Sequence, residues 1–344
     1  MERLALATFA LAAFALALFV PALSKASTLD TVRSRGSVAC GVGESFPGFF
    51  AMDSQGVWHG LDVDFCRALS AAIFGNPNQV AFRVATPVAR FVQLQSGEVD
   101  VLSRSVTWTL SREAGQGLEF TGVTFFDGQG FMVRRASGIT AAAQLSGAAI
   151  CTQTGTTTER NLSDWFTARK LPFTPVVFET ADQAIAAYEA QRCDAYTTDR
   201  STLAARITRL HDPAANLILP DTITMAANGP VVRRDDPQWA ALVRWTLNAL
   251  IAAEVHGVTS ANVDTVAKAT VDPETRRLLG VNGGLGKFLG LGDDWAASAI
   301  RAVGNYGEIY ARNLGGSLGV VIPREGSPNR LARDGGLLFS PSFE

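Results

Sequence analysis

Residues 97–113, GEVDVLSRSVTWTLSRE, combine a run of small hydroxyl side chains with an arginine close to the end of the segment. An apolar strand predicted over Val99–Leu102 leads into this run, which ends at Arg112 and contains Ser103, Ser105, Thr107, Thr109 and Ser111. Such a segment could form a nucleophilic site, a phosphate cradle or a carboxylate receptor. No base is placed for a nucleophile, and no glycine-rich loop precedes a helix here to hold a phosphate. The pattern therefore favours a carboxylate receptor, in which the Arg112 guanidinium donates two parallel hydrogen bonds.

Two further segments carry polar groups that could bind a small ligand. Gly155-Thr156-Thr157 precedes a helix predicted from Glu159, where hydroxyls and free backbone N–H groups favour an anion. Thr156 or Thr157 could equally be only a helix cap. Asp199 ends the predicted strand AYTTD, and it could bind a cation or cap the helix that begins STLAAR.

Motifs for catalysis, metals and nucleotides are weak. Gly315–Gly319 matches G-x-S-x-G, but a helix precedes it and a proline-containing tail follows, whereas a nucleophile elbow needs a strand and then a helix. His59, His211 and His256 are scattered and make no metal-binding spacing. GLGKFLG follows no strand and is not a dinucleotide fingerprint. We therefore predict no catalytic residue, no metal and no cofactor.

The composition indicates an exported, folded protein. The 344 residues allow two domains, and the net charge of −2 without a basic run argues against nucleic acid as a partner. Residues 1–26 read as a cleavable signal peptide, because an early Arg3 precedes an apolar run over residues 4–20, then Pro21 and a small-residue cleavage site. No later segment approaches membrane-spanning length, so a soluble mature protein is expected.

Export also decides how the four cysteines are interpreted. An even number of cysteines in an oxidising compartment favours disulfides over metal binding or catalysis. Cys40 lies in a predicted strand and Cys66 in the helix after it, while Cys151 and Cys193 lie in or before strands of the second half. Of the three possible pairings, we predict Cys40–Cys66 and Cys151–Cys193.

Two α/β units follow each other along the chain. The first has strands at 38–42, 80–84 and 99–102 with helices at 62–74 and 88–96, and the second has strands at 148–151, 175–178 and 195–198 with helices at 159–169 and 181–190. This alternation predicts two lobes, each with a mostly parallel sheet flanked by helices.

Two extended segments, FDGQGFMVRR and MAANGPVVRRDDP, are placed to cross between these lobes as hinge strands. A helix over 237–253, with Trp239 and Trp245 as core residues, would pack back onto lobe 1. One helix over 294–312 and a Gly/Pro-rich tail complete the chain.

At this point the sequence resembles a known family over about residues 28–315. The resemblance is carried by the segments LDTVRSRGSVACGV, GVWHGLDVDFCRALSAAIFG, RFVQLQSGEVDVLSRSVTWTLSRE, CTQTGTTTERNL, RCDAYTTDRSTL and WAASAIRAVGNYGEIYARNLG. These segments resemble the amino-acid-binding proteins of bacterial ABC importers, solute-binding family 3, and within that family the general L-amino-acid branch.

The resemblance implies a two-lobed periplasmic binding protein of type II. After the signal peptide (1–26) expected above, it divides the chain into lobe 1 (27–131), lobe 2 (132–228) and a return to lobe 1 (229–315). The tail (316–344) is not covered by the resemblance, and no role is assigned to it. The resemblance further implies a periplasmic monomer in a Gram-negative bacterium, with an L-amino acid as ligand and an ABC permease and its ATPase as partners.

The resemblance also assigns roles within the binding site. Arg112 matches the arginine that binds the ligand carboxylate, Thr157 contributes to the same carboxylate, and Asp199 receives the ammonium. Phe46, with Phe49 as a further candidate and Glu44 as a weaker one, lies where the family places an aromatic ring over the ligand side chain. Ser103, Ser105, Thr107 and Thr156 complete the predicted ligand-binding set.

An enzyme on the same scaffold, such as an exported dehydratase or lyase, is the alternative. It needs a general acid or base beyond the groups that hold the ligand. Asp199 and Glu44 are the only carboxylates that the sequence places near the site, and ligand binding already accounts for Asp199. The sequence therefore favours a binding protein.

Overall fold

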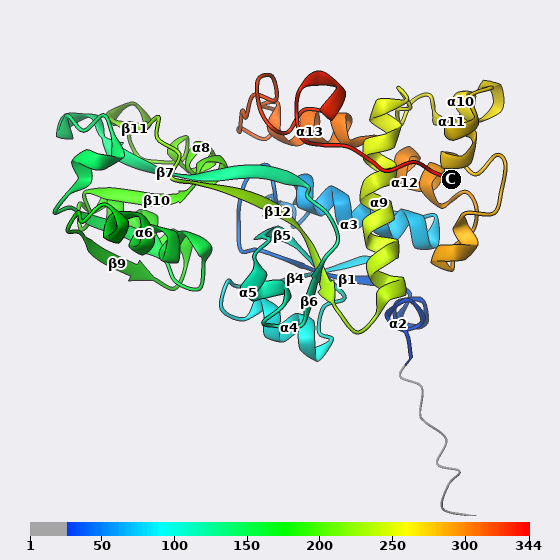
Figure 1. Ribbon diagram of the computed structural model, residues 1–344, viewed down its shortest axis with the longest axis horizontal. Coiled ribbons are helices and arrows are strands. Elements are labelled where there is room, and N and C mark those ends of the chain that lie inside the picture. Colours follow the sequence, from blue (N-terminus) through cyan, green and yellow to red (C-terminus); the bar gives the residue numbers. More distant parts are fainter. Residues whose placement is uncertain (1–25) are drawn as a thin grey trace, which may run out of the picture.

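The computed structural model describes residues 26–344, so the predicted signal peptide lies almost wholly outside the described residues. Two lobes, joined by two long strands, make up the molecule (Figure 1). No helix among residues 26–344 is long and apolar enough to cross a membrane.

Lobe 1 is built on three parallel strands with helices on both faces. The strands lie in the order β4-β1-β5, and β5 is followed in the sheet by the crossing strand β12. The elements of lobe 1 are α2 (Thr28–Arg35), β1 (Val38–Val42), β2 (Ala51–Met52), β3 (Trp58–His59), α3 (Leu61–Phe74), β4 (Val80–Val84), α4 (Arg90–Ser96), β5 (Val101–Thr107), α5 (Leu110–Glu113), β6 (Leu118–Phe120), α9 (Pro237–Val255), α10 (Val263–Ala269), α11 (Pro273–Leu278), α12 (Trp295–Val303) and α13 (Tyr306–Leu314).

Lobe 2 repeats this plan on a smaller scale. Its parallel strands lie in the order β10-β8-β9, and the crossing strand β7 is antiparallel to β10. The elements of lobe 2 are β8 (Ala149–Gln153), α6 (Thr157–Ala168), β9 (Thr174–Phe178), α7 (Ala181–Glu189), β10 (Ala195–Asp199), α8 (Arg200–Ile207) and β11 (Asn216–Ile218).

The two crossing strands, β7 (Phe125–Arg134) and β12 (Thr224–Arg233), pair with each other between the lobes. Their antiparallel register joins residues 224–228 to residues 125–129. Beyond this stretch β12 pairs with β5 and β6 of lobe 1, whereas β7 pairs with β10 and β11 of lobe 2. The predicted pair of hinge strands is therefore confirmed, and the proposed lobe boundaries at 131/132 and 228/229 fall inside them.

Apolar side chains fill both faces of each sheet. In lobe 1, one cluster packs under α3, α9 and α12, and a second cluster that includes Leu94 and Phe120 packs on the opposite face. In lobe 2, Phe131 and Phe166 belong to one cluster and Tyr188 and Tyr196 to another. Each lobe thus has its own core, as expected for layers of helix, sheet and helix.

Both disulfides join a strand to a neighbouring element within one lobe. Cys40 on β1 is bonded to Cys66 on α3, and Cys151 on β8 is bonded to Cys193 just before β10. These are the two pairs expected from the sequence.

Two predicted elements end differently in the structure. Strand β5 continues to Thr107, five residues beyond the predicted end, because Val106 and Thr107 are paired to Gly229 and Asn228 of β12. The single helix predicted over 294–312 is two helices, since Gly304 (φ +84°) ends α12 and Asn305 caps α13. Asn305 and Glu308 form a capping box there.

The C-terminal tail lies along lobe 1 and contacts the first crossing strand (Figure 1). The Asn329 side chain accepts a hydrogen bond from the Phe126 backbone N–H at 2.7 Å and donates one to the Phe126 carbonyl at 2.8 Å. Arg324 forms a two-point ion pair with Glu254 of α9, at 2.6 and 3.0 Å. Farther along, Phe343 packs edge-on against Trp245. The tail is therefore part of the packed structure of lobe 1.

Replacing Asn329 with alanine is expected to lower the free energy of unfolding by about 2 kcal/mol. Asn329 is 2% exposed, so its loss leaves the N–H and C=O of Phe126 without their partners in a buried place. Urea unfolding followed by circular dichroism measures the change. Asn78→Ala, at an exposed asparagine, is the matched control. Equal stability of the two variants would show that the tail does not hold this strand.

Candidate functional site

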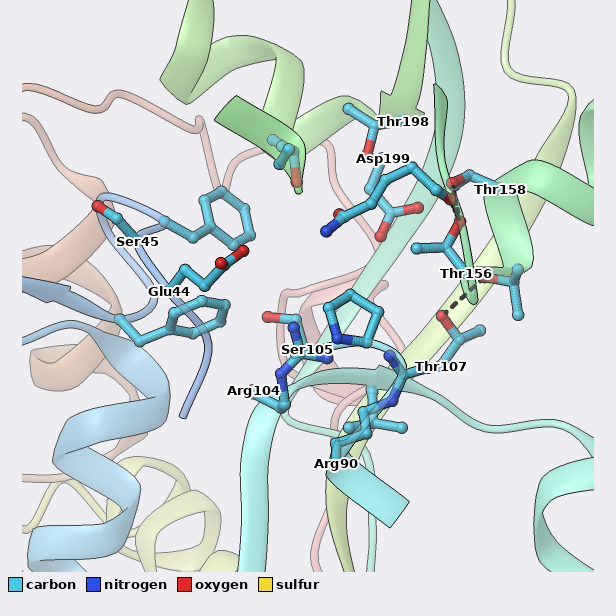
Figure 2. A pocket seen from close by; sticks show the side chains of 18 of the residues that line it. Glu44, Ser45, Arg90, Arg104, Ser105, Thr107, Thr156, Thr158, Thr198 and Asp199 are labelled. Atoms are coloured by element: carbon cyan, nitrogen blue, oxygen red, sulfur yellow. Dashed lines mark hydrogen bonds between the residues drawn. The ribbon is translucent and has the colours of Figure 1, made fainter. Parts of the chain in front are cut away.

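A cavity lies between the two lobes, and each lobe contributes polar side chains to it (Figure 2). Lobe 1 contributes Glu44, Ser45, Phe46, Phe50, Pro87, Arg90, Arg104, Ser105, Val106, Thr107 and Arg112. Lobe 2 contributes Gln153, Thr156, Thr157, Thr158, Ala181, Thr198, Asp199, Thr202 and Arg206.

Strand β5 reaches the cavity with an unusual backbone at Ser105. Its φ of +53° lies in the left-handed region, which costs a residue other than glycine about 1–2 kcal/mol. The register of β5 against β12 shifts nearby, between Gly229 and Val231. Residues held in such a conformation are often found at functional sites, because the surrounding structure must compensate for the strain.

The buried carboxylate of Asp62 anchors this part of β5. Asp62, in the first turn of α3, accepts hydrogen bonds from the Ser103 hydroxyl at 3.0 Å and the Ser105 hydroxyl at 2.9 Å. Burial raises the pKa of Asp62 to about 6. Ser103 is completely buried and does not line the cavity, so the structure does not bring this predicted ligand contact to the site. Ser105 does line it, but its hydroxyl is directed to Asp62.

Arg112 lies in the short helix α5, whose first turn is capped by Thr109. Its Nη1 donates to the Thr107 carbonyl at 2.8 Å, and its guanidinium lies 5.5 Å from the centre of the Phe91 ring. Burial lowers the pKa of Arg112 to about 10, although Asp199 acts in the opposite direction, so the side chain stays charged at neutral pH. The carbonyl contact uses one donor and leaves the others for an anion.

Lobe 2 presents the N-terminus of α6 to the cavity. Thr156 is the cap: its hydroxyl accepts from the Glu159 N–H at 3.2 Å and donates to the Gln153 carbonyl at 2.7 Å. The Thr157 hydroxyl lies 3.2 Å from that of Thr107, so the two lobes meet at these predicted residues (Figure 2). The helix N-terminus adds a positive potential that favours a carboxylate.

Asp199 ends β10 and precedes α8, but its side chain makes no capping hydrogen bond. Asp199 is thus the residue at the N-cap position of α8, but its carboxylate is not used as a cap. Burial and the nearby carboxylate of Asp127 raise the pKa of Asp199 well above its ordinary value, and Arg112 opposes this shift. A cation bound beside a buried carboxylate stabilises its ionised form.

The aromatic wall is formed by Phe46 and Phe50, which both line the cavity. The structure thus brings Phe46 to the cavity, and its contact with a ligand side chain stays a prediction. Phe49 stacks on Phe46, with 4.2 Å between ring centres, but is 1% exposed and lies behind the wall. Glu44, the weaker candidate, lines the cavity beside them.

With this geometry established, the chain can be compared with known proteins. Residues 38–276 match the family described as bacterial extracellular solute-binding proteins, family 3. The chain belongs to this family. The two lobes and paired hinge strands are those of a type II periplasmic binding protein, as expected from the sequence.

Similar family 3 proteins match nearly the whole chain. The general L-amino acid-binding periplasmic protein AapJ of Rhizobium johnstonii is 47% identical over 92% of this chain and 93% of its own. The glutamate/glutamine/aspartate/asparagine-binding protein BztA of Rhodobacter capsulatus is 45% identical over 94% of this chain and 95% of its own. A Brucella ovis ABC transporter periplasmic binding protein, solved with glutathione bound, is 46% identical with a TM-score of 0.89, and the match covers 93% of this chain and 100% of that one.

Sequence reasoning missed three arginines of this family 3 site. Arg90 of α4 donates to the Gly155 carbonyl across the cavity at 3.2 Å. Arg206 of α8 forms an ion pair with Asp182 at 2.7 Å and contacts the Ser45 carbonyl at 3.4 Å. Arg104 lies on β5 between the two anchored serines. Extending the predicted strand past Leu102 would have placed Arg104 on the face opposite to Ser103 and Ser105, whereas Arg90 and Arg206 gave no signal.

The described residues contain no candidate metal site. Among residues 26–344, no three His, Cys, Asp or Glu side chains gather closely enough to hold a metal ion.

Proposed function

We propose that this protein is an extracytoplasmic receptor that binds L-amino acids between its lobes and delivers them to an ABC permease. The observation that carries the proposal is the pair of opposite charges, Arg112 from lobe 1 and Asp199 from lobe 2, that face one cavity. An α-amino acid bears a carboxylate and an ammonium on one carbon, and burying either charge without a partner costs several kcal/mol.

In this proposal Arg112 and the α6 N-terminus bind the carboxylate. The guanidinium has free donors, and the hydroxyls of Thr107 and Thr157 are adjacent to each other at 3.2 Å. Thr156 acts mainly by capping α6. Ser105 contributes backbone groups, and Ser103 acts only through Asp62.

Asp199 binds the ammonium, and its raised pKa supports this role. The ligand cation replaces the water that the buried carboxylate has lost, so binding favours the ionised form of Asp199. Phe46 and Phe50 cover the ligand side chain. No chemical step is proposed, because the carboxylates of the site are used for binding.

The partners and location follow from the family and from similar proteins. Relatives named as periplasmic, such as AapJ, match more than nine-tenths of this chain, which supports a periplasmic receptor delivered by a cleaved signal peptide. We propose a monomer that docks on permease subunits driven by an ATPase, with lobes at 27–131 plus 229–315 and at 132–228. No nucleic acid takes part.

Calorimetric titration of the purified protein with the twenty L-amino acids tests the proposal. Binding of at least one of them with one-to-one stoichiometry is expected. Absence of binding to all twenty, or turnover of a bound amino acid, would contradict it.

A further inference from the structure

Arg104 is a half-buried charged group of the site whose guanidinium has no hydrogen-bond partner among the described residues. Its Nε is buried without a partner, and among residues 26–344 no hydrogen bond or ion pair involves its guanidinium. The guanidinium lies 5.9 Å from the centre of the Phe50 ring, on the wall of the cavity (Figure 2). A buried donor left unpaired costs about 1–3 kcal/mol, so this group is suited to a ligand that supplies an acceptor.

The backbone around Arg104 is held in place by its neighbours. Ser103 and Ser105, on either side of it, both donate to the buried Asp62. The left-handed conformation at Ser105 further distinguishes this stretch from a regular strand. Arg104 therefore projects from a fixed piece of backbone, which is what a specificity-determining residue requires.

Glu44 supplies an acceptor on the same wall. It lies beside the aromatic pair, and within the described chain it forms no ion pair with Arg104. The two charges nevertheless attract each other: burial lowers the pKa of Arg104, and the nearby Glu44 carboxylate opposes this shift. A donor and an acceptor that face one cavity without binding each other can bind the two ends of a polar group.

We propose that Arg104 and Glu44 form a subsite for ligand side chains that end in a carboxyl-derived group. A free carboxylate accepts hydrogen bonds from Arg104. A carboxamide, or the γ-peptide bond of a γ-glutamyl peptide, accepts from Arg104 through its oxygen and donates to Glu44 through its N–H. The inference rests on the proposed function, since it assumes that Arg112 and Asp199 hold the amino-acid end.

The surrounding charges favour this assignment. Burial lowers the pKa of Arg90, and the nearby charges of Arg104 and Arg112 lower it further. Asp62 and Glu44 offset part of the charge of Arg104, but an aliphatic side chain would leave its buried Nε donor without an acceptor. The site therefore selects against aliphatic amino acids and for acids, amides or γ-glutamyl peptides.

Calorimetry of the full-length mature protein with L-glutamate, L-glutamine, glutathione and L-leucine tests the subsite. We expect wild type to bind at least one of the first three at least about tenfold more tightly than L-leucine. Arg104→Met should reduce that preference at least about tenfold, because it weakens binding of the polar ligands and leaves L-leucine binding unchanged or stronger. Arg83→Gln, at an exposed arginine of β4, is the control for removing a positive charge and should change neither.

Glu44→Gln provides a second test if Arg104→Met does not fold. Removing the negative charge should increase the affinity for L-glutamate relative to L-glutamine by about threefold or more, because only the acid is repelled by Glu44. The ligand that binds most tightly among L-glutamate, L-glutamine and glutathione shows whether the subsite takes a free carboxylate, a carboxamide or a γ-peptide bond.

Three results would overturn the subsite. The first is wild-type protein that binds L-leucine as tightly as the three polar ligands. The second is an equal loss of affinity for all four ligands in Arg104→Met, and the third is an unchanged glutamate-to-glutamine ratio in Glu44→Gln. Binding of L-leucine alone would leave the proposed function intact, whereas failure to bind any amino acid would remove both.

Discussion

Replacing Arg112 with alanine is expected to abolish binding of every amino acid that the wild-type protein binds, regardless of its side chain. Arg112 contacts the Thr107 carbonyl with one donor and has the rest of its guanidinium free for the ligand carboxylate, which all amino acids share. Removing one partner from a desolvated charge pair costs about 2–5 kcal/mol, which lowers the affinity at least about 30-fold.

The measurement is calorimetric titration of Arg112→Ala with the ligands that bind wild type. Arg83→Ala is the matched control, because Arg83 is exposed on β4 and does not line the cavity. A variant that kept tight binding of some amino acids and lost only others would show that Arg112 reads side chains, and that the carboxylate is held elsewhere.

Replacing Asp199 with asparagine is expected to weaken binding at least about tenfold and to remove most of its pH dependence. The ligand ammonium needs an ionised Asp199, but burial and Asp127 raise the pKa of this carboxyl. In wild type, affinity should therefore fall as pH falls through the raised pKa, and binding below it should release a proton.

As pH rises, the affinity for the ligand should increase, whereas the contribution of Asp199 to the stability of the unliganded protein should decrease. A raised pKa means that the folded state keeps a proton where the unfolded chain has already lost it. Asp199 therefore lowers the free energy of unfolding as pH rises from the ordinary aspartate range through its raised pKa. Asp199→Asn should be at least as stable as wild type at neutral pH in thermal unfolding. A large loss of stability, together with unchanged affinity, would assign Asp199 to folding instead of binding.

Much of the fold could be predicted because short-range patterns determine it. The strand at Val80–Val84 and the crossing strands were recognisable from apolar runs bounded by turn residues. The end of β5 was not recognisable, since its last residues are polar and form a strand only through pairing with β12, far away in the sequence. The break at Gly304 was missed because apolar periodicity continues across it.

Part of the lining of the cavity could be predicted from the sequence, whereas Arg104 could not. Arg112, Thr157 and Asp199 stand at the ends of recognisable elements, where a resemblance can align them. Arg104 was singled out because its buried Nε has no hydrogen-bond partner in the folded molecule. Whether a side chain finds a partner depends on long-range packing, which no sequence pattern indicates. The packing of the tail against β7 is likewise a long-range contact, between positions 203 residues apart.

The central proposal is that the two lobes together bind both charges of an α-amino acid. Analogues of one ligand that lack one of these charges test it most directly. Calorimetry should compare the tightest-binding L-amino acid with compounds that lack one of its charges. For L-glutamate these are glutarate, which lacks the ammonium, and 4-aminobutyrate, which lacks the α-carboxylate. We predict that both analogues bind at least about 30-fold more weakly than the amino acid. Affinity for either analogue equal to that for the amino acid would contradict the account.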